Sequence, residues 1–181
     1  LFATRKIRVR SDLAAVFPDV NDTRFREWFT RQDDGSYTLQ HKFGASTLLS
    51  GYIYNASGGE TDLPARIPVI KLGEVALIAA EALNRDERPD EAAEWLIELQ
   101  TSKRSTIVEQ LKADGKISVE TIATAIRDEY QREFWGEGQR FFFHKRMGDS
   151  RIASYSGDSI DISNEQYTWP IPAETLSVNL Q

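Results

Sequence analysis

The acidic side chains best placed for acid/base chemistry stand at regular intervals between residues 129 and 137. Glu129, Glu133 and Glu137 follow one another four positions apart, which places them near one face if this stretch is helical. A pair of carboxylates, one with a raised pKa, is what a glycoside hydrolase uses as general acid and base. Arg132 and Arg140 are interleaved at i+3 spacing, so the same residues can instead form a network of ion pairs. Because all the carboxylates share one element, we predict that Glu133, Glu137 and Arg140 form structural ion pairs and do not catalyse.

The rest of the sequence lacks the patterns on which metal sites, cofactors and nucleophilic catalysis depend. It has no Cys, and its two histidines, His41 and His144, lie far apart and outside any metal-binding spacing. It contains no GxGxxG, Walker or GxSxG motif. We therefore expect no metal and no cofactor. The net charge of -6 disfavours nucleic acid as a partner, because neutralising phosphates requires clustered Lys and Arg.

A sugar-binding surface would need exposed aromatic rings beside polar side chains. The CH faces of sugars stack on Tyr and Trp, while Asn, Asp, Arg and Gln form hydrogen bonds with the hydroxyls. The candidates for such contacts, all in loop-like sequence, are Tyr37, Tyr52, Tyr54 and Asn55. The alternative for each Tyr is a ring that half-covers the core and keeps its hydroxyl in water. By contrast, Trp95, Trp135 and Trp169 are expected to be packing residues.

The acidic row must be positioned by a helix, and the hydrophobic pattern predicts one over residues 118–136, the longest in the chain. Its apolar positions step by three and four residues, and Ser118 can cap its first turn. The segment that follows contains three consecutive phenylalanines, 141–143, which are expected to lie in the core.

The remaining elements make the predicted fold mainly α. Pro68 favours a helix start, and a Pro also stands at the start of the next helix, so two helices joined by a short turn are expected to pack as an antiparallel pair. Asp22 can cap a short helix, and Asp114-Gly115 ends another. The predicted helices span 11–17, 22–29, 68–84, 89–101 and 105–113; short strands are expected at 36–39 and 47–54, and none after Gly58.

Four segments follow one another along the chain: IPVIKLGEVALIAAEALNR, DEAAEWLIELQTSKR, REFWGEGQRFFFHKRMG and YTWPIPAETLSVNLQ. Taken in this order, they resemble the SusD/RagB-like outer-membrane nutrient-binding lipoproteins of Bacteroidetes. The similarity covers about residues 66–181, and Asp22-Thr23-Arg24 is similar to a shorter motif that precedes them. The sequence departs from the family pattern at Lys71, where Arg is usual, and at His144, where Asp is common.

The resemblance implies a fold of tetratricopeptide-type helix hairpins with irregular loops and few short strands. It implies a non-catalytic protein that binds glycans or similar nutrients at the cell surface and delivers oligosaccharide to a SusC-like, TonB-dependent transporter. Residues 1–66 are then an irregular segment with short helices, and 67–181 are the C-terminal helical region, in one structural domain that is part of a longer chain. The lipid anchor of such an outer-membrane lipoprotein would lie outside this sequence. Two alternatives stay open: a helical-repeat scaffold that binds proteins, and an acid/base glycoside hydrolase.

Overall fold

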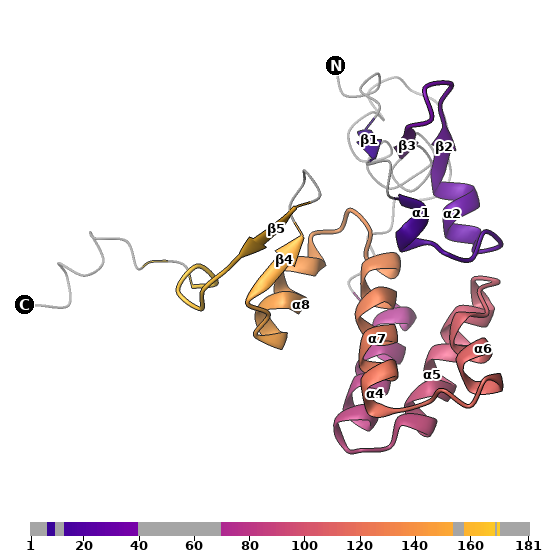
Figure 1. Ribbon diagram of the computed structural model, residues 1–181, viewed down its shortest axis with the longest axis vertical. Helices are drawn as coiled ribbons and strands as arrows, with labels where there is room; N and C mark the ends of the chain where they lie inside the picture. The colour runs from indigo at the N-terminus through magenta and orange to yellow at the C-terminus, as the bar shows by residue number, and fades with distance from the viewer. Residues whose placement is uncertain (1–6, 10–12, 40–69, 154–157, 169, 171–181) are drawn as a thin grey trace, which may run out of the picture. The chain divides into compact units, whose positions relative to one another are not determined.

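The protein is mainly helical with a few short strands, as predicted (Figure 1). The computed structural model describes residues 7–9, 13–39, 70–153, 158–168 and 170. The chain divides into two compact units, residues 1–133 and 134–181. The predicted boundary between residues 66 and 67 lies outside the described residues, as does the predicted strand at 47–54. Within the described ranges, no helix is long and apolar enough to span a membrane.

The first unit begins with a small antiparallel sheet and two short helices. The strands β1 (Ile7–Val9), β3 (Tyr37–Leu39) and β2 (Phe29–Arg31) lie side by side in that order. Helices α1 (Leu13–Val16) and α2 (Thr23–Trp28) connect β1 to β2. The carboxylate of Asp22 accepts a hydrogen bond from the backbone N–H of Arg24 at 2.9 Å, so the predicted N-cap is confirmed.

Four helices complete the first unit. They are α4 (Leu72–Arg85), α5 (Pro89–Ser102), α6 (Ile107–Ala113) and α7 (Val119–Glu133). Helices α4 and α5 form the predicted hairpin, and α7 packs against α4 (Figure 1). Small side chains let these helices approach closely, and larger apolar ones fill the space between them. The buried apolar residues of this bundle are Ala76, Leu77, Ala80, Ala92, Ala93, Leu96, Leu99, Val108, Ile122, Ala125 and Ile126.

The helix boundaries follow local capping chemistry. Ser118 Oγ accepts from the N–H of Thr121 at 3.2 Å, and Thr121 Oγ1 accepts from the N–H of Ser118 at 2.9 Å. This reciprocal pair has the form of a capping box with Thr in place of Glu. At the first long helix the prediction was too long: α4 begins at Leu72, with Lys71 at the N-cap, and Pro68 lies outside the described residues.

The predicted long helix over 118–136 is the longest of the helices that the structure describes, but it ends at Glu133. Gly136 and Gly138 have φ values of +74° and +76°, in the left-handed region that glycine adopts without a steric cost. These two residues interrupt the helix, so the stretch from 129 to 148 is not the end of one helix. A separate helix, α8 (Gln139–Met147), follows in the second unit.

The second unit contains strands that the sequence analysis missed. Strands β4 (Arg151–Ala153) and β5 (Ser159–Asp161) pair antiparallel, so the prediction of no strands after Gly58 was wrong. Arg151 Nε donates to Asp161 Oδ1 at 2.9 Å across the pair, and this contact supports its register. Each strand has only three residues, too few for a period of two to stand out in the sequence.

The three phenylalanines of α8 do not all lie in the core. Phe143 is buried, whereas 64% of Phe142 is exposed. Phe141 packs its ring against that of Tyr167, with centroids 5.5 Å apart. Consecutive residues on a helix point in different directions, so one packed face of α8 does not bury all three rings.

Candidate functional site

Two members of the acidic row, Glu129 and Glu133, lie on α7 and are buried. The cation that separates their carboxylates comes from the N-terminal part of the chain. Arg24 Nη1 donates to Glu129 Oε1 at 2.6 Å and to Glu133 Oε2 at 3.0 Å. The same guanidinium donates from Nε and Nη2 to the two carboxylate oxygens of Asp22, at 3.0 and 2.7 Å. One planar cation therefore holds three carboxylates, the geometry for which Arg is better suited than Lys.

The second oxygen of Glu129 extends this buried network toward other helices. Its Oε2 accepts from Gln100 Nε2 at 2.9 Å and from Arg132 Nε at 3.0 Å. Gln100 Oε1 in turn accepts from the N–H of Val108, and Arg132 Nη1 donates to the carbonyl of Val16. We call Asp22, Arg24, Gln100, Glu129, Arg132 and Glu133 the Arg24 network. It joins α1, α2, α5, α6 and α7.

The electrostatics of the Arg24 network keep its central groups charged. Burial acts to raise the pKa of Glu129, but attraction to Arg24 and Arg132 and the hydrogen bonds it accepts outweigh burial, so this pKa lies below its ordinary value. Burial acts to lower the pKa of Arg24, yet hydrogen bonding to Asp22 and attraction to Glu129 raise it. A general acid needs a raised carboxyl pKa, so Glu129 has the opposite of the shift that glycoside hydrolysis requires.

A glycine allows α4 to reach the Arg24 network. A Cβ atom at Gly73 would lie 2.7 Å from Glu133 Oε1, well inside van der Waals contact. Because Glu133 is held in place by Arg24, its carboxylate cannot move aside at no cost. The absence of a side chain at residue 73 is therefore what permits the close approach of α4 and α7.

The three residues predicted as one ion-pair cluster fall in different units. Glu133 belongs to the Arg24 network, whereas Glu137 and Arg140 lie in the second unit. Arg140 is exposed and donates from Nε to Nε2 of the buried His144 at 3.0 Å. Since Nε2 accepts, Nδ1 carries the proton, and it donates to Asp149 Oδ2 at 2.6 Å. The joint structural role of Glu133, Glu137 and Arg140 stays a prediction.

Of the four ligand-binding candidates, only Tyr37 lies among the described residues. Tyr52, Tyr54 and Asn55 fall outside them. Tyr37 is half-buried in β3, and its ring centroid lies 5.7 Å from that of Phe25, which also packs near Phe17 and Phe29. A role for Tyr37 in binding a ligand stays a prediction.

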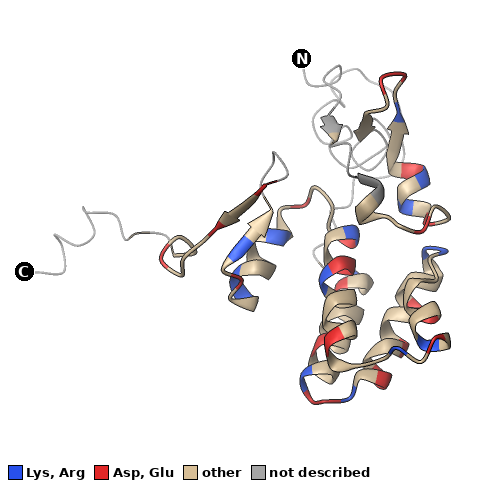
Figure 2. Cartoon of the chain, viewed as in Figure 1, with Lys and Arg blue, Asp and Glu red and all other residues tan. Residues whose placement is uncertain are grey.

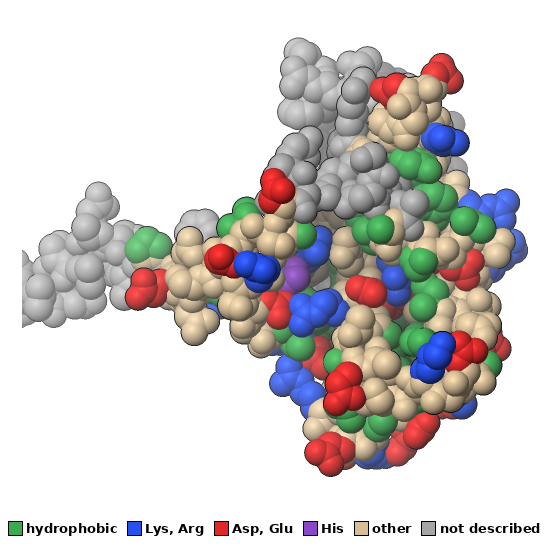
Figure 3. Space-filling model, viewed as in Figure 1, with side chains coloured by type: hydrophobic (Ala, Val, Ile, Leu, Met, Phe, Trp, Pro, Cys, Tyr) green, Lys and Arg blue, Asp and Glu red, His purple; other side chains and the backbone are tan. Residues whose placement is uncertain are grey.

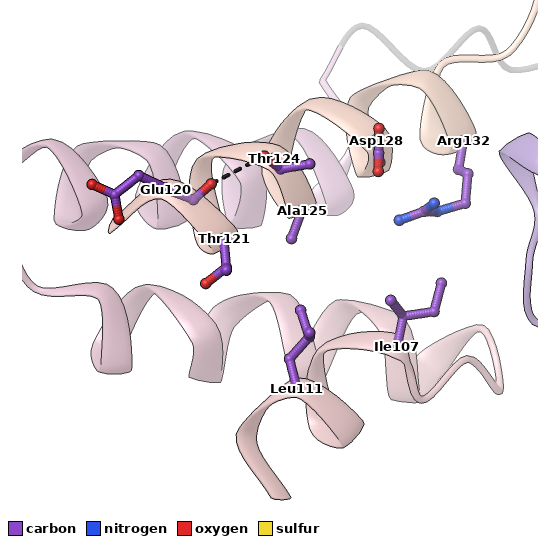
Figure 4. A pocket seen from close by; sticks show the side chains of 8 residues that line it. All are labelled: Ile107, Leu111, Glu120, Thr121, Thr124, Ala125, Asp128 and Arg132. Carbon is purple, nitrogen blue, oxygen red and sulfur yellow. Dashed lines mark hydrogen bonds between the residues drawn. The ribbon is translucent and has the colours of Figure 1, made fainter. Parts of the chain in front are cut away.

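A first hollow, of about 310 Å³, lies between α6 and α7 (Figure 4). Figure 4 shows Ile107 and Leu111 of α6 pointing toward Thr121 and Ala125 of α7. The threonine hydroxyls that line this hollow already have partners, because Thr121 donates to the carbonyl of Lys116 and Thr124 donates to the carbonyl of Glu120. The hollow therefore offers a ligand an apolar floor and few free polar groups.

A second hollow, of about 210 Å³, lies between α4 and α5. Trp95 forms part of its wall with 41% of its surface exposed, so the prediction that Trp95 is a packing residue was wrong. Trp95, Glu98 and Ser102 occupy one face of α5 at i, i+3 and i+7. The lining residues are Leu72, Gly73, Ala76, Trp95, Glu98, Leu99, Ser102 and Lys103. We call this hollow the Trp95 groove.

Residues of both charge signs occur along the described part of the chain (Figure 2), although α5 carries only acidic and α8 only basic ones. Side chains of both signs are interspersed on the face of the molecule seen in Figure 3. The surface seen in Figure 3 therefore has no broad field of one sign. Across the described residues, no cluster of three or more His, Asp or Glu side chains is arranged to hold a metal ion.

Comparison with known proteins agrees with the arrangement of these helices. The model of the SusD family matches residues 36–181, which include α4 to α8. Searches among curated proteins and among solved structures returned no match. Proteins of the SusD family are generally non-catalytic binding proteins. This agrees with the buried carboxylates of Glu129 and Glu133, which are engaged in ion pairs with Arg24. The family match covers most of the chain, and the chain therefore belongs to the SusD family, which supports a general role in glycan binding and nutrient uptake.

Proposed function

We propose that this protein is a non-catalytic glycan-binding protein of the bacterial cell surface that delivers oligosaccharide to a SusC-like, TonB-dependent transporter. The observation that carries the proposal is the match of the SusD family model over residues 36–181. In its full-length form the protein acts as a surface-exposed lipoprotein of the outer membrane. The ligand is an oligosaccharide or polysaccharide, and nucleic acid is not a partner.

The chemistry of the buried carboxylates supports binding over catalysis. Glu129 is fully buried and its pKa is lowered, so it neither reaches a substrate nor holds a proton to donate at neutral pH. Glu133 is likewise buried against Arg24. The acidic row on α7, which offered the best pattern for hydrolysis, is engaged in holding helices together.

Tyr37, Tyr52, Tyr54 and Asn55 remain our proposed contributors to the ligand site. Tyr side chains supply a ring face for a sugar and a hydroxyl that bonds at its edge, and an Asn amide can donate and accept at once. Each contact of this kind is modest, because the competing water molecules bind the same hydroxyls.

The test uses the full-length protein. Its migration is measured in native gels that contain one polysaccharide each, and the same mixtures are assayed for new reducing ends. The protein is also purified in detergent from its native membrane, and the partner proteins that accompany it are identified. We expect retarded migration with at least one polysaccharide, no new reducing ends and recovery of a SusC-like transporter. Release of reducing ends would replace the proposal with a hydrolase, and a lack of both retardation and transporter would favour a protein-binding scaffold.

A further inference from the structure

We propose that the Trp95 groove is a subsite for one neutral pyranose ring, stacked on the indole of Trp95. The inference rests on the proposed function, because it locates one contact of the glycan that such a protein binds. It assigns the contact to the α4–α5 hairpin, whereas Tyr37 belongs to strand β3.

The exposed indole is the first observation. Trp is the largest apolar side chain, and leaving 41% of it in water forgoes burial that a packed ring would gain. The CH face of a pyranose can cover such a ring while its hydroxyls stay hydrated at the rim. Within the described part of the chain, the Trp95 indole N–H donates to no other group, so it is free to bond a sugar oxygen.

Polar groups around the indole fit the hydroxyls of a sugar. Glu98 brings a carboxylate that accepts, and Lys103 an ammonium that donates. Among the described residues, neither side chain makes an ion pair or a hydrogen bond, with the other or with any neighbour. Ser102 donates its hydroxyl to the carbonyl of Leu99 at 2.6 Å, which leaves its oxygen able to accept.

The charge and the size of the groove narrow the ligand class. One carboxylate and one ammonium cancel, so the lining favours a neutral ring over a uronic acid or an amino sugar. At 210 Å³ the groove is smaller than the roughly 300 Å³ at which sites for drug-sized ligands begin, so it accommodates one ring of a longer chain. Leu72, Ala76 and Leu99 give it the apolar floor on which a CH face can rest.

The groove is preformed because α5, which forms one of its walls, is held in place by buried contacts on its opposite face. On α5, Leu96 is buried in the bundle and Gln100 in the Arg24 network. The carbonyl of Lys103 accepts from the N–H of Thr23 at 2.8 Å, which anchors the end of this wall to α2. A site that is ordered before binding loses less entropy when the ligand arrives.

The test compares variants of the full chain in binding neutral hexamers of α-1,4-glucose, β-1,4-glucose and β-1,4-xylose, with a hexamer of galacturonate as the charged comparison. Affinities are measured by calorimetry. Trp95→Ala removes the stacking face, and Phe142→Ala on α8 is the matched control, since it truncates an exposed aromatic ring elsewhere. Glu98→Gln and Lys103→Met test the polar rim without removing the ring. Unfolding midpoints of all variants are recorded.

We expect one neutral hexamer to bind, Trp95→Ala to weaken it by about fivefold to tenfold, and Phe142→Ala to leave it unchanged. Glu98→Gln and Lys103→Met should weaken it by smaller factors. If the wild type binds a hexamer and Trp95→Ala binds it equally well, the subsite is overturned while the proposed function stands. If galacturonate binds and the neutral hexamers do not, the neutral-ring assignment is wrong. If the wild-type chain binds no glycan at all, both the subsite and the proposed function fail.

Discussion

Arg24 and Glu129, 105 positions apart in the sequence, are joined by a hydrogen bond of 2.6 Å in the interior of the first unit. Both side chains are almost fully buried. Taking such charges out of water is costly unless each is paired and hydrogen-bonded, and here every carboxylate of the network faces a guanidinium. Removing one partner is therefore much more damaging than the net stabilisation of the pair would suggest.

Replacing Arg24 by Met should strongly destabilise the first unit. Glu129 would keep only Arg132 as a cation, and Glu133 would lose Arg24, so we expect the free energy of unfolding to fall by about 3–5 kcal/mol. Urea unfolding followed by circular dichroism gives this value. Arg88→Met is the control, because it breaks an exposed ion pair with Glu91 and should change stability little. A loss of less than about 1 kcal/mol in Arg24→Met would contradict the proposed role of the network.

The lowered pKa of Glu129 predicts a loss of stability in acid. Because the pKa of the folded state lies below the ordinary value of 4.5, the stabilisation is complete above that value and disappears as the pH falls through the folded-state pKa. Urea unfolding at a series of pH values below 6 should show this decline. Glu129→Gln should lower the free energy of unfolding at neutral pH and make its decline in acid less steep. Glu109→Gln, on the exposed face of α6, should leave the decline as steep as in the wild type. An equally steep decline in Glu129→Gln would assign the acid effect to other carboxyl groups.

Gly73→Ala should destabilise the protein although Ala is the better helix former. The added Cβ would meet Glu133 Oε1 at 2.7 Å, and the crowding should cost about 2–3 kcal/mol, in the upper part of the usual range for overpacking and more than the gain in helix propensity of about 1 kcal/mol. A double-mutant cycle with Glu133→Ala measures this clash directly. In the Glu133→Ala background, Gly73→Ala should no longer destabilise; an unchanged cost would mean that the crowding arises from another neighbour.

The contacts of His144 should be visible by NMR. In its neutral form, His144 should carry its proton on Nδ1, because Nε2 accepts from Arg140 and Nδ1 lies 2.6 Å from Asp149. Long-range ¹H–¹⁵N correlation spectra distinguish the two tautomers, and His41→Asn identifies which histidine gives the signal. Arg140→Ala should weaken the preference for this tautomer but not abolish it, because the hydrogen bond from Nδ1 to Asp149 remains. A proton found on Nε2 would contradict the arrangement.

Much of the helical architecture could be predicted from residues with strong local preferences. Pro89 stands at the first position of α5, Ser118 caps α7, and the turn at Asp114 and Gly115 ends α6. Each of these signals acts within a few residues, so no tertiary contact is needed to interpret it. The end of α7 was placed too late because the apolar stripe continues into Phe134, beyond the point at which Gly136 and Gly138 turn the chain.

The Arg24 network could be predicted only in part. The spacing of Glu129 and Glu133 indicated that cations must intervene, but the interleaved Arg132 was the visible candidate, and nothing local connects α7 with residue 24. The similarity of Asp22-Thr23-Arg24 to a family motif was the one available signal. Long-range pairs of this kind depend on topology, which local patterns do not encode. Trp95 was misjudged for a related reason, since its helix position alone does not say what covers the ring.

The pairing of Arg24 with the acidic row also constrains how the protein is made. Arg24 leaves the ribosome 105 residues before Glu129, so its guanidinium must stay solvated while α4, α5 and α6 are synthesised. Until the Arg24 guanidinium docks against α7, Glu129 and Glu133 repel each other, and this repulsion opposes the burial of their side of the helix. Closing this long chain segment is thus coupled to the burial of α7, and the first unit reaches its final packing only after both ends of its sequence have emerged.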